Sequence, residues 1–301
     1  MSYFLSICIP TYNGGENLKY NINKLIKMQP EYGFEICVSD NASDDGTQEF
    51  MTIAANKYKF IKYHRNKENM GIAYNFDYVL NMASGEYRWL LGDDDEIVEE
   101  NLGKVIRALK ENRPDICVVN GGTIQYKYRV KNIETRLFKD KNAVLSILGE
   151  HMTWMSCLVM SKTFVSKVNI RKVTNNAFPH LIEVFKVLDK YCNLLWIYDS
   201  CVYMQINNQN RYSEHYLDYF IKDWVGITEQ IGNYSQEAKS NFCKVGEQRL
   251  FSFKSILSLR ARNIINDNNV EKCRIALKSF SRKTKYTIYL VNILPLSVFK
   301  I

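Results

Sequence analysis

The sequence predicts an α/β fold: a Rossmann-like, doubly wound and mostly parallel sheet with a C-terminal helical extension. Short apolar runs alternate with stretches of helical spacing throughout the N-terminal half. Clusters of polar, turn-forming residues follow several of the apolar runs. A hydrophobic content of 46% is typical of a globular protein with a substantial core.

Five apolar runs in the N-terminal half are expected to be buried strands. They span residues 4–9, 34–38, 60–63, 87–91 and 116–119. Between the runs, apolar residues recur at helical spacing, as Leu18, Ile22 and Leu25 do. Alternating strands and helices imply a parallel sheet covered on both faces. We expect this first domain to span residues 1–211.

Residues 212–301 are expected to form a separate helical region that includes a long helix over residues 236–265. Towards the end of the chain, four basic side chains between residues 278 and 285 precede an apolar, aromatic segment. This segment is shorter than the ~20 residues that a membrane span requires. It fits a helix at a membrane surface, and it also fits a helix docked on the domain.

The run Gly92-Asp93-Asp94-Asp95 follows the fourth expected strand directly. Adjacent carboxylates repel one another unless a positive charge lies among them. Mg²⁺ and Mn²⁺ prefer oxygen ligands and commonly use one or two carboxylates plus substrate phosphates. In open α/β sheets, ligands bind at this end of the strands. An acidic turn that begins the next helix is the alternative interpretation.

Polar clusters also follow the first and second expected strands, at residues 11–13 and 40–45. The carboxyl ends of parallel strands lie along one edge of a sheet. We therefore expect these clusters and the acidic run to form one polar site.

Taken together, these motifs resemble the family 2 glycosyltransferases, which have the GT-A fold. The matching segments are residues 6–13 with Glu16, residues 38–47, residues 69–71 with Asn75, residues 84–87 and residues 92–95. The second and last segments look similar to those of abequosyltransferase-like enzymes of O-antigen assembly. The resemblance implies an inverting hexosyl- or deoxyhexosyltransferase. Such an enzyme moves a sugar from a nucleotide-sugar donor to a glycan or lipid-linked acceptor in bacterial surface polysaccharide synthesis.

The resemblance also implies roles for individual residues. Asp94 and Asp95 would hold the metal ion, Mn²⁺ or Mg²⁺, that bridges the two phosphates of the donor. The nucleotide sugar would be bound by Pro10, Thr11, Tyr12, Asn13, Glu16, Asp40, Asn41, Asn69, Gly71, Asn75 and Asp93.

The sequence departs from the family pattern at two positions. Commoner members carry Asp where Gly92 stands, so the division of roles among the three carboxylates stays open. Relatives often carry Arg where Tyr74 stands. The compensating cation would be Arg65 or Lys67, unless the metal suffices.

An inverting transferase needs a general base for the acceptor hydroxyl. Many relatives place an acidic pair at the start of a helix near the acceptor, and Pro179-His180 stands here instead. His180 would be the base, a metal ligand or a donor contact, and Glu183 lies one turn further on the same side. Ordinary structural roles are the alternative for both. Trp154 would stack on a sugar or pack in the core.

Several other functions fit the sequence less well. No GxGxxG motif follows the first strand, which argues against a dinucleotide-dependent dehydrogenase. A sugar nucleotidyltransferase would carry a basic, Gly-rich loop, whereas residues 10–16 contain no Lys or Arg. A non-catalytic carbohydrate-binding relative remains an alternative. The net charge of +8 fits an anionic partner, but nucleic acid is not expected beside three carboxylates.

The eight scattered cysteines contain no CxxC spacing and are expected to be reduced and buried. The first residues show no signal-peptide pattern. We therefore expect a cytoplasmic protein, attached peripherally to the cytoplasmic face of the inner membrane through residues 278–299. The sequence does not indicate an oligomeric state.

Overall fold

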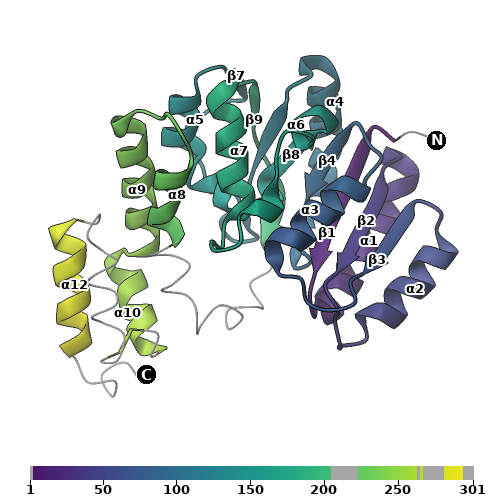
Figure 1. The fold of residues 1–301 in the computed structure, drawn as a ribbon, viewed down its shortest axis with the longest axis horizontal. Helices are drawn as coiled ribbons and strands as arrows, with labels where there is room; N and C mark the ends of the chain where they lie inside the picture. Colours follow the sequence, from purple (N-terminus) through teal and green to yellow (C-terminus); the bar gives the residue numbers. More distant parts are fainter. Residues whose placement is uncertain (1–2, 205–222, 263–264, 267–280, 294–301) are drawn as a thin grey trace. The chain divides into compact units, whose positions relative to one another are not determined.

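The computed structural model describes residues 3–204, 223–262, 265–266 and 281–293 (Figure 1). The chain divides into two compact units. The first comprises Met1–Lys141, His151–Thr174 and Pro179–Asn208, and the second comprises Asn142–Glu150, Asn175–Phe178 and Gln209–Ile301. The expected domain boundary at residues 211 and 212 lies outside the described residues.

A mixed sheet forms the centre of the first unit. Its strands are β1 (Leu5–Thr11), β2 (Glu35–Asp40), β3 (Ile61–Arg65), β4 (Tyr87–Leu90), β5 (Asp95–Ile97), β6 (Ile116–Thr123), β7 (Arg136–Phe138), β8 (Leu158–Ser161) and β9 (Leu194–Met204). The strand order is β3-β2-β1-β4-β8-β6-β9-β5, and β7 pairs with β9. In Figure 1, β1 to β4 lie side by side.

The first four strands of this sheet run parallel to their neighbours. Strand β6 is also parallel to β9, whereas β8 is antiparallel to both β4 and β6. The expected α/β fold with a mostly parallel sheet is therefore confirmed. The short strands β5 and β7 pair antiparallel with β9, and the sequence patterns did not predict these three strands.

Helices cover the sheet of the first unit. They are α1 (Gly15–Tyr32), α2 (Thr47–Lys57), α3 (Ile72–Met82), α4 (Glu99–Asn112), α6 (Lys162–Val165) and α7 (Pro179–Lys190), with short 3₁₀ helices η1 (His151–Thr153), η2 (Met155–Cys157) and η3 (Ile170–Lys172). Helix α3 packs on β1 and β2, α2 on β3, and α4 on β9. Helix α1 ends at Gly33, whose left-handed conformation (φ 65°) lets its N–H bond the Gln29 carbonyl at 2.8 Å.

Glu35 is a buried carboxylate that connects β2 to the turn before β4. Its side chain accepts hydrogen bonds from Ser6 Oγ (2.6 Å), the Ser84 N–H (2.5 Å) and the Gly85 N–H (3.0 Å). Lys62 Nζ lies 2.9 Å from its other oxygen. Burial raises the pKa of Glu35, but the donors outweigh it, so the net shift is downward. Gly85 is required here because a Cβ would lie 2.3 Å from Ser6 Oγ.

We expect Glu35→Ala to lower the free energy of unfolding by about 2–4 kcal/mol, because several buried donors lose their acceptor. Equilibrium denaturation with urea measures the change. Glu86→Ala is the matched control, because Glu86 is half-exposed and pairs with Arg113 at the surface. Its cost should stay below about 1 kcal/mol. Equal losses in the two variants would contradict a structural role for the Glu35 network.

In the second unit, the described helices are α5 (Lys141–Leu148, from Asn142 onward), α8 (Trp224–Gln230), α9 (Gln236–Leu250), α10 (Phe253–Ala261) and α12 (Arg282–Ile293). Its core contains Trp224 stacked on Phe242, with ring centroids 4.4 Å apart and planes 2° apart. Gly246 allows this stack, because a Cβ there would lie 2.2 Å from the Trp224 ring.

The prediction of one long helix over residues 236–265 is wrong. The chain forms α9 and α10 instead, separated at Phe251 and Ser252. Ser252 begins α10 because its Oγ accepts the N–H of Ser255 at 3.2 Å, a standard N-cap interaction. Part of the expected segment, at residues 263–264, lies outside the described residues.

Two further expectations concern the chain as a whole. Seven cysteines in the described residues are free, and six of them are buried, as the scattered spacing predicted. Within the described residues, every helix is too short or too polar to cross a bilayer.

Candidate active site

The carboxyl ends of β1, β2 and β3 are aligned in the sheet. Thr11 pairs with Asp40 in the register of β1 and β2, and Asp40 pairs with Arg65 in the register of β2 and β3. The fourth strand reaches the same edge, because the Leu91 N–H bonds the Cys8 carbonyl at 2.9 Å. The first polar clusters of the sequence therefore lie at one edge, as expected.

A direct hydrogen bond joins the first cluster to the acidic run, which we call the acidic turn (residues 92–95). Thr11 Oγ1 donates to Asp93 Oδ2 at 2.7 Å, and both side chains are buried. Gly14 lies against this pair, and a Cβ there would approach Thr11 Oγ1 to 2.4 Å and Asp93 Oδ2 to 2.8 Å. The first motif needs glycine at this position so that the bond can form.

Two buried asparagines fix the backbone around the site. Asn21 of α1 donates from one side-chain amide to the carbonyls of Asp93 and Asp95, both at 2.8 Å. Asn75 of α3 donates to the Thr11 carbonyl at 3.2 Å and accepts from Ser39 Oγ at 2.6 Å. Asn75, which is expected to bind the nucleotide sugar, bridges β1 and β2.

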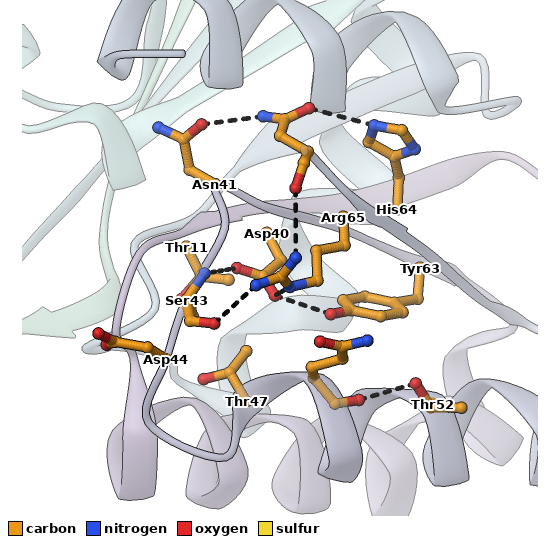
Figure 2. A network of polar contacts seen from close by, with 12 residues as sticks. Thr11, Asp40, Asn41, Ser43, Asp44, Thr47, Thr52, Tyr63, His64 and Arg65 are labelled. Carbon is orange, nitrogen blue, oxygen red and sulfur yellow. Dashed lines mark hydrogen bonds and ion pairs between the residues drawn. The ribbon is translucent and has the colours of Figure 1, made fainter. Parts of the chain in front are cut away.

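The carboxylate of Asp40 organises the turn after β2 (Figure 2). It is fully buried and accepts the Ser43 N–H at 2.8 Å and the Tyr63 hydroxyl at 2.7 Å. Arg65 Nε lies 3.6 Å away, and its guanidinium also donates to the Ser43 carbonyl at 3.0 Å. Burial and the bond to Asp40 raise the pKa of Tyr63, so its hydroxyl stays protonated.

Asn41 connects this turn to the loop before α3. Its Oδ1 accepts from Asn66 Nδ2 and from the Met70 N–H, both at 2.9 Å, and its Nδ2 donates to Asn69 Oδ1 at 2.6 Å. Asn69 Oδ1 also accepts the Gly71 N–H at 3.0 Å. The residues of segments 38–47 and 69–71 that are expected to bind the nucleotide sugar are therefore held in one hydrogen-bond network.

The backbone of the second motif is strained at one position. Ala42 has a φ of 66°, in the left-handed backbone region that residues other than Gly and Asn rarely adopt. Asn13 has a φ of 54°, and its N–H bonds Ser43 Oγ at 2.9 Å. Strain of this kind is maintained where surrounding contacts over-determine the backbone, and it concentrates at functional sites.

Asp95 occupies a different environment from the other two carboxylates. Its Oδ2 accepts the Trp154 Nε1–H at 2.6 Å and the Ser156 hydroxyl, and Ser156 Oγ in turn accepts the Gly92 N–H at 2.8 Å. Burial and then the charge of Asp94 raise the pKa of Asp95 to about 7, while the bonds from Ser156 and Trp154 oppose the shift. Trp154 is therefore a core residue that positions Asp95.

The same contacts explain glycine at position 92. A Cβ on Gly92 would lie 2.8 Å from Asp95 Oδ2 and 3.1 Å from Asp94 Oδ1. The space that a larger side chain would need is taken by the neighbouring carboxylates. Asp94 is the most exposed of the three carboxylates.

The other expected donor residues differ in exposure. Pro10 is buried within β1, whereas Tyr12, Asn13, Asn69 and Gly71 are exposed at the sheet edge. Glu16 is exposed in the first turn of α1 and pairs with Lys19 at 2.8 Å. Buried side chains thus form a scaffold, and exposed ones remain accessible to a ligand.

The pattern described as Glycosyl transferase family 2 matches residues 6–168, more than half of the chain, and includes every strand end described above. The chain belongs to this family.

Among its family 2 relatives, the chain is similar to abequosyltransferase RfbV of Salmonella typhimurium, at 38% identity over 114 residues. The match covers 37% of this chain and 34% of that protein, so the chain spans about a third of the length of the first curated relatives it matches.

Solved structures show the same fold. The S. aureus TarS 1-349 complex with UDP-GlcNAc has a TM-score of 0.62 at 17% identity, covering 94% of this chain and 83% of that one. The mannosyltransferase PcManGT of Pyrobaculum calidifontis with GDP-Man and Mn²⁺ has a TM-score of 0.58 at 13% identity, covering 97% and 84%. The expected GT-A fold is thus confirmed.

The donor atoms of the acidic turn suit a hard divalent cation. Within the described residues, no three His, Cys, Asp or Glu side chains form a metal site by themselves. Mg²⁺ in phosphate chemistry is commonly held by one or two carboxylates together with the phosphates of the substrate. Burial and then the charge of Asp94 raise the pKa of Asp95, and a cation beside the turn would favour its ionised form.

A positively charged side chain also lies beside Tyr74, the position at which relatives often carry Arg. Arg171 of η3 stacks over the ring of Tyr74, 4.4 Å from its centroid, and pairs with Asp77 at 2.5 Å. Arg65, one of the two expected substitutes, is instead engaged with Asp40 and Ser43. The other, Lys67, is exposed in the loop before α3.

His180 lies at the start of α7 and is almost fully buried. The centroid of its ring is 5.6 Å from that of Phe76 of α3. Neither ring nitrogen meets full hydrogen-bond geometry with a described residue, although the Met152 and Thr153 carbonyls lie near the ring. Burial lowers its pKa to about 4, against the opposing effect of the Met152 and Thr153 carbonyls. The imidazole is therefore neutral at pH 7, with a lone pair available.

Glu183 is placed differently from His180. Its Oε2 accepts the Asn169 N–H at 3.0 Å, and its Oε1 pairs with Lys186 at 2.9 Å. One carboxylate oxygen thus holds the chain before η3, and the other pairs with a lysine within α7. These contacts support a positioning role, and the sequence already favoured an ordinary structural role more for Glu183 than for His180.

We expect stability to fall as pH decreases from about 6.5 to about 4, because His180 protonates in the unfolded chain first. The folded state disfavours the proton, so the contribution is present above the unfolded pKa and is lost below it. The whole contribution of His180 to the free energy of unfolding is about 3 kcal/mol. His180→Leu should flatten this part of the profile in denaturation experiments. Leu181→Ala, a neighbouring core variant, should lower stability without flattening it.

Proposed function

We propose that this protein is an inverting glycosyltransferase that moves a hexosyl or deoxyhexosyl group from a nucleotide sugar to a glycan or lipid-linked acceptor of bacterial surface polysaccharide. The observation that carries the proposal is the hydrogen bond between Thr11 and Asp93. It joins the first motif to the acidic turn within the region that matches family 2. Incubation with UDP-, GDP-, CDP- and dTDP-sugars, followed by measurement of nucleotide release, tests it.

Two classes of residue support donor binding. Exposed Tyr12 and Asn13 offer an aromatic face and an amide beside the turn after β2. Exposed Asn69 and Gly71 lie at the start of α3, where backbone N–H groups favour a phosphate. The exposed residues depend on three buried side chains that fix the loops carrying them, namely Asp40, Asn41 and Asn75.

A divalent cation at Asp94, and at Asp93 or Asp95, would supply Lewis-acid stabilisation of the leaving nucleoside diphosphate. Asp94 has the most exposed carboxylate of the turn, so it is the side chain best placed to contact an ion. The bonds from Thr11 and Trp154 orient the two flanking carboxylates. Arg171, beside Tyr74, adds a positive charge at the first turn of α3.

Removal of divalent metal should abolish sugar transfer, and Mn²⁺ or Mg²⁺ should restore it, because charge on the leaving group is then compensated. Asp94→Asn should lower kcat/KM by at least about 10²-fold, or ~3 kcal/mol, with an unchanged melting temperature. Asp199→Asn, a change at an exposed carboxylate on β9, is the control and should retain activity. Full transfer by metal-free protein would refute this assignment.

His180 is the residue that we propose as general base. A neutral imidazole carries a lone pair on one ring nitrogen, which can accept a hydrogen bond from a hydroxyl group of the acceptor, and His180 is neutral at pH 7 because it is buried. The proton would pass to a ring nitrogen while the acceptor oxygen bonds the anomeric carbon. The bond to the phosphate oxygen breaks in the same step, and the nucleoside diphosphate leaves with its electrons.

His180→Gln should lower kcat by about 10²-fold, while binding of the nucleotide sugar stays near the wild-type value. Glu183→Gln is the matched comparison within α7, because it removes the charge that holds Asn169 and Lys186. That variant should mainly lower the melting temperature. Stopped assays and isothermal titration distinguish the two effects. A wild-type kcat in both variants would place the base elsewhere.

The proposed acceptor gives the protein a reason to approach the inner leaflet of the membrane. The expected attachment segment, residues 278–299, is described only in part, at residues 281–293. Its described portion is α12, which carries basic side chains near its start and exposed aromatic residues.

A further inference from the structure

Helix α12 has two apolar faces. Ile288 and Val291 are buried within the second unit, together with Thr284. The opposite stripe is exposed and consists of Tyr286, Tyr289, Leu290 and Ile293, with exposed fractions of 64%, 59%, 45% and 62%. Spacings of three, four and seven residues place these four side chains on one side of a helix. A contiguous apolar stripe in water is unfavourable and indicates a contact surface.

The first turn of α12 carries an unusual charge distribution. It contains Arg282, Lys283 and Lys285 but no acidic residue. Cations at a helix N-terminus are disfavoured by the helix dipole. Glu247 of α9 provides the local negative charge instead, accepting bonds from the Ser281 N–H at 3.0 Å and from the Thr284 hydroxyl. These contacts secure α12 on α9 in spite of its basic start.

Helix α10 packs against α12 and carries a pocket of its own. The pocket has a volume of about 300 Å³ and is lined by Lys254, Ser255, Ser258, Leu259 and Arg262. Neither Lys254 nor Arg262 has an acidic partner among the described residues. Ser258 adds an exposed hydroxyl. Two cations and a hydroxyl group match the oxygen atoms of a phosphate group.

We propose that α10 and α12 together form a docking surface for an anionic lipid bilayer. The exposed stripe of α12 enters the interfacial layer, and the pocket on α10 binds the phosphate of an anionic headgroup. Tyrosine suits this position, because its ring is apolar and its hydroxyl group remains hydrated at the headgroup level. Basic side chains at the surface add attraction to the anionic lipid.

A bilayer fits this surface better than a second copy of the chain. A symmetric dimer in which the two α12 helices run parallel would bring the basic first turns of both copies together, where like charges repel. A bilayer supplies the opposite charge. The inference deepens the proposed function, since it concerns how the enzyme reaches a lipid-linked acceptor, but it is measured without any sugar transfer.

Co-sedimentation with vesicles tests the apolar stripe. The 301-residue protein should pellet with vesicles of equimolar phosphatidylcholine and phosphatidylglycerol, and much less with phosphatidylcholine alone. Leu290→Ser combined with Ile293→Ser should weaken partitioning at least about tenfold, because buried hydrocarbon is lost. Ile53→Ser, at an isoleucine of α2 that is 68% exposed, is the matched control and should bind normally.

The pocket on α10 is tested separately. Lys254→Ala combined with Arg262→Ala should weaken partitioning onto the anionic vesicles about 30-fold, since each basic residue contributes on the order of 1 kcal/mol. Lys239→Ala combined with Lys244→Ala removes the same charge from α9 and should have a much smaller effect. Rising salt should weaken wild-type binding and reduce the difference.

All variants should keep the melting temperature and the nucleotide-sugar binding of the wild-type protein. A loss of vesicle binding then tests this inference separately from the proposed function. Failure of the protein to pellet with anionic vesicles at low salt would overturn it, even if sugar transfer is intact. Equal binding to both vesicle types would overturn the role of the pocket. A wild-type dimer that Ile293→Ser dissociates, without vesicle binding, would assign the stripe to a second copy of the chain instead.

Discussion

The acidic turn brings three carboxylates next to one another at the end of β4, where their repulsion has to be offset. Thr11 holds the first, and Trp154 and Ser156 hold the third. These donors come from two parts of the chain far from the turn in sequence, so forming the turn requires β1 and η2 to be in place. The geometry of the site is therefore a result of tertiary packing, and local turn formation alone would not produce it.

The neighbouring loops follow the same principle. Asp40 is fully buried with its donors, and the residues after it adopt a strained backbone that includes Ala42. Such a conformation persists because hydrogen bonds from Ser43, Tyr63 and Arg65 over-determine it. The cost is conformational, and the gain is a rigid edge on which exposed side chains can meet a ligand without further ordering.

Local patterns were sufficient to predict the first four strands, their helices and the common edge of their polar ends. They could not reveal contacts between residues far apart in sequence, such as Trp154 with Asp95 or Arg171 with Tyr74. The sequence therefore left two interpretations of Trp154 open, stacking on a sugar or packing in the core. Strand β9 was missed because Asp199 interrupts its apolar pattern.

The division of the expected long helix has a similar explanation. Helical spacing continues through the segment, but Ser252 can cap a new helix, and this local signal was overlooked in favour of periodicity. Glycine at position 92 was noted as a departure from the family without a reason. The structure supplies one, because the Asp95 carboxylate fills the adjacent space.

Asn21 has a consequence for how the acidic turn responds to an ion. Its single amide group binds the carbonyls of Asp93 and Asp95, so the peptide unit before Asp94 and the one after Asp95 are fixed to α1. The peptide unit between Asp94 and Asp95 is held within the turn, because the Asp95 N–H bonds the Gly92 carbonyl at 3.2 Å. If an ion binds at Asp94 as proposed, adjustment to ions of different radius would then come from rotation about the side-chain bonds of Asp94. Rotamer changes of this kind in accessible side chains take picoseconds to nanoseconds. Exchange between Mg²⁺ and Mn²⁺ would accordingly leave the main chain of the turn unchanged.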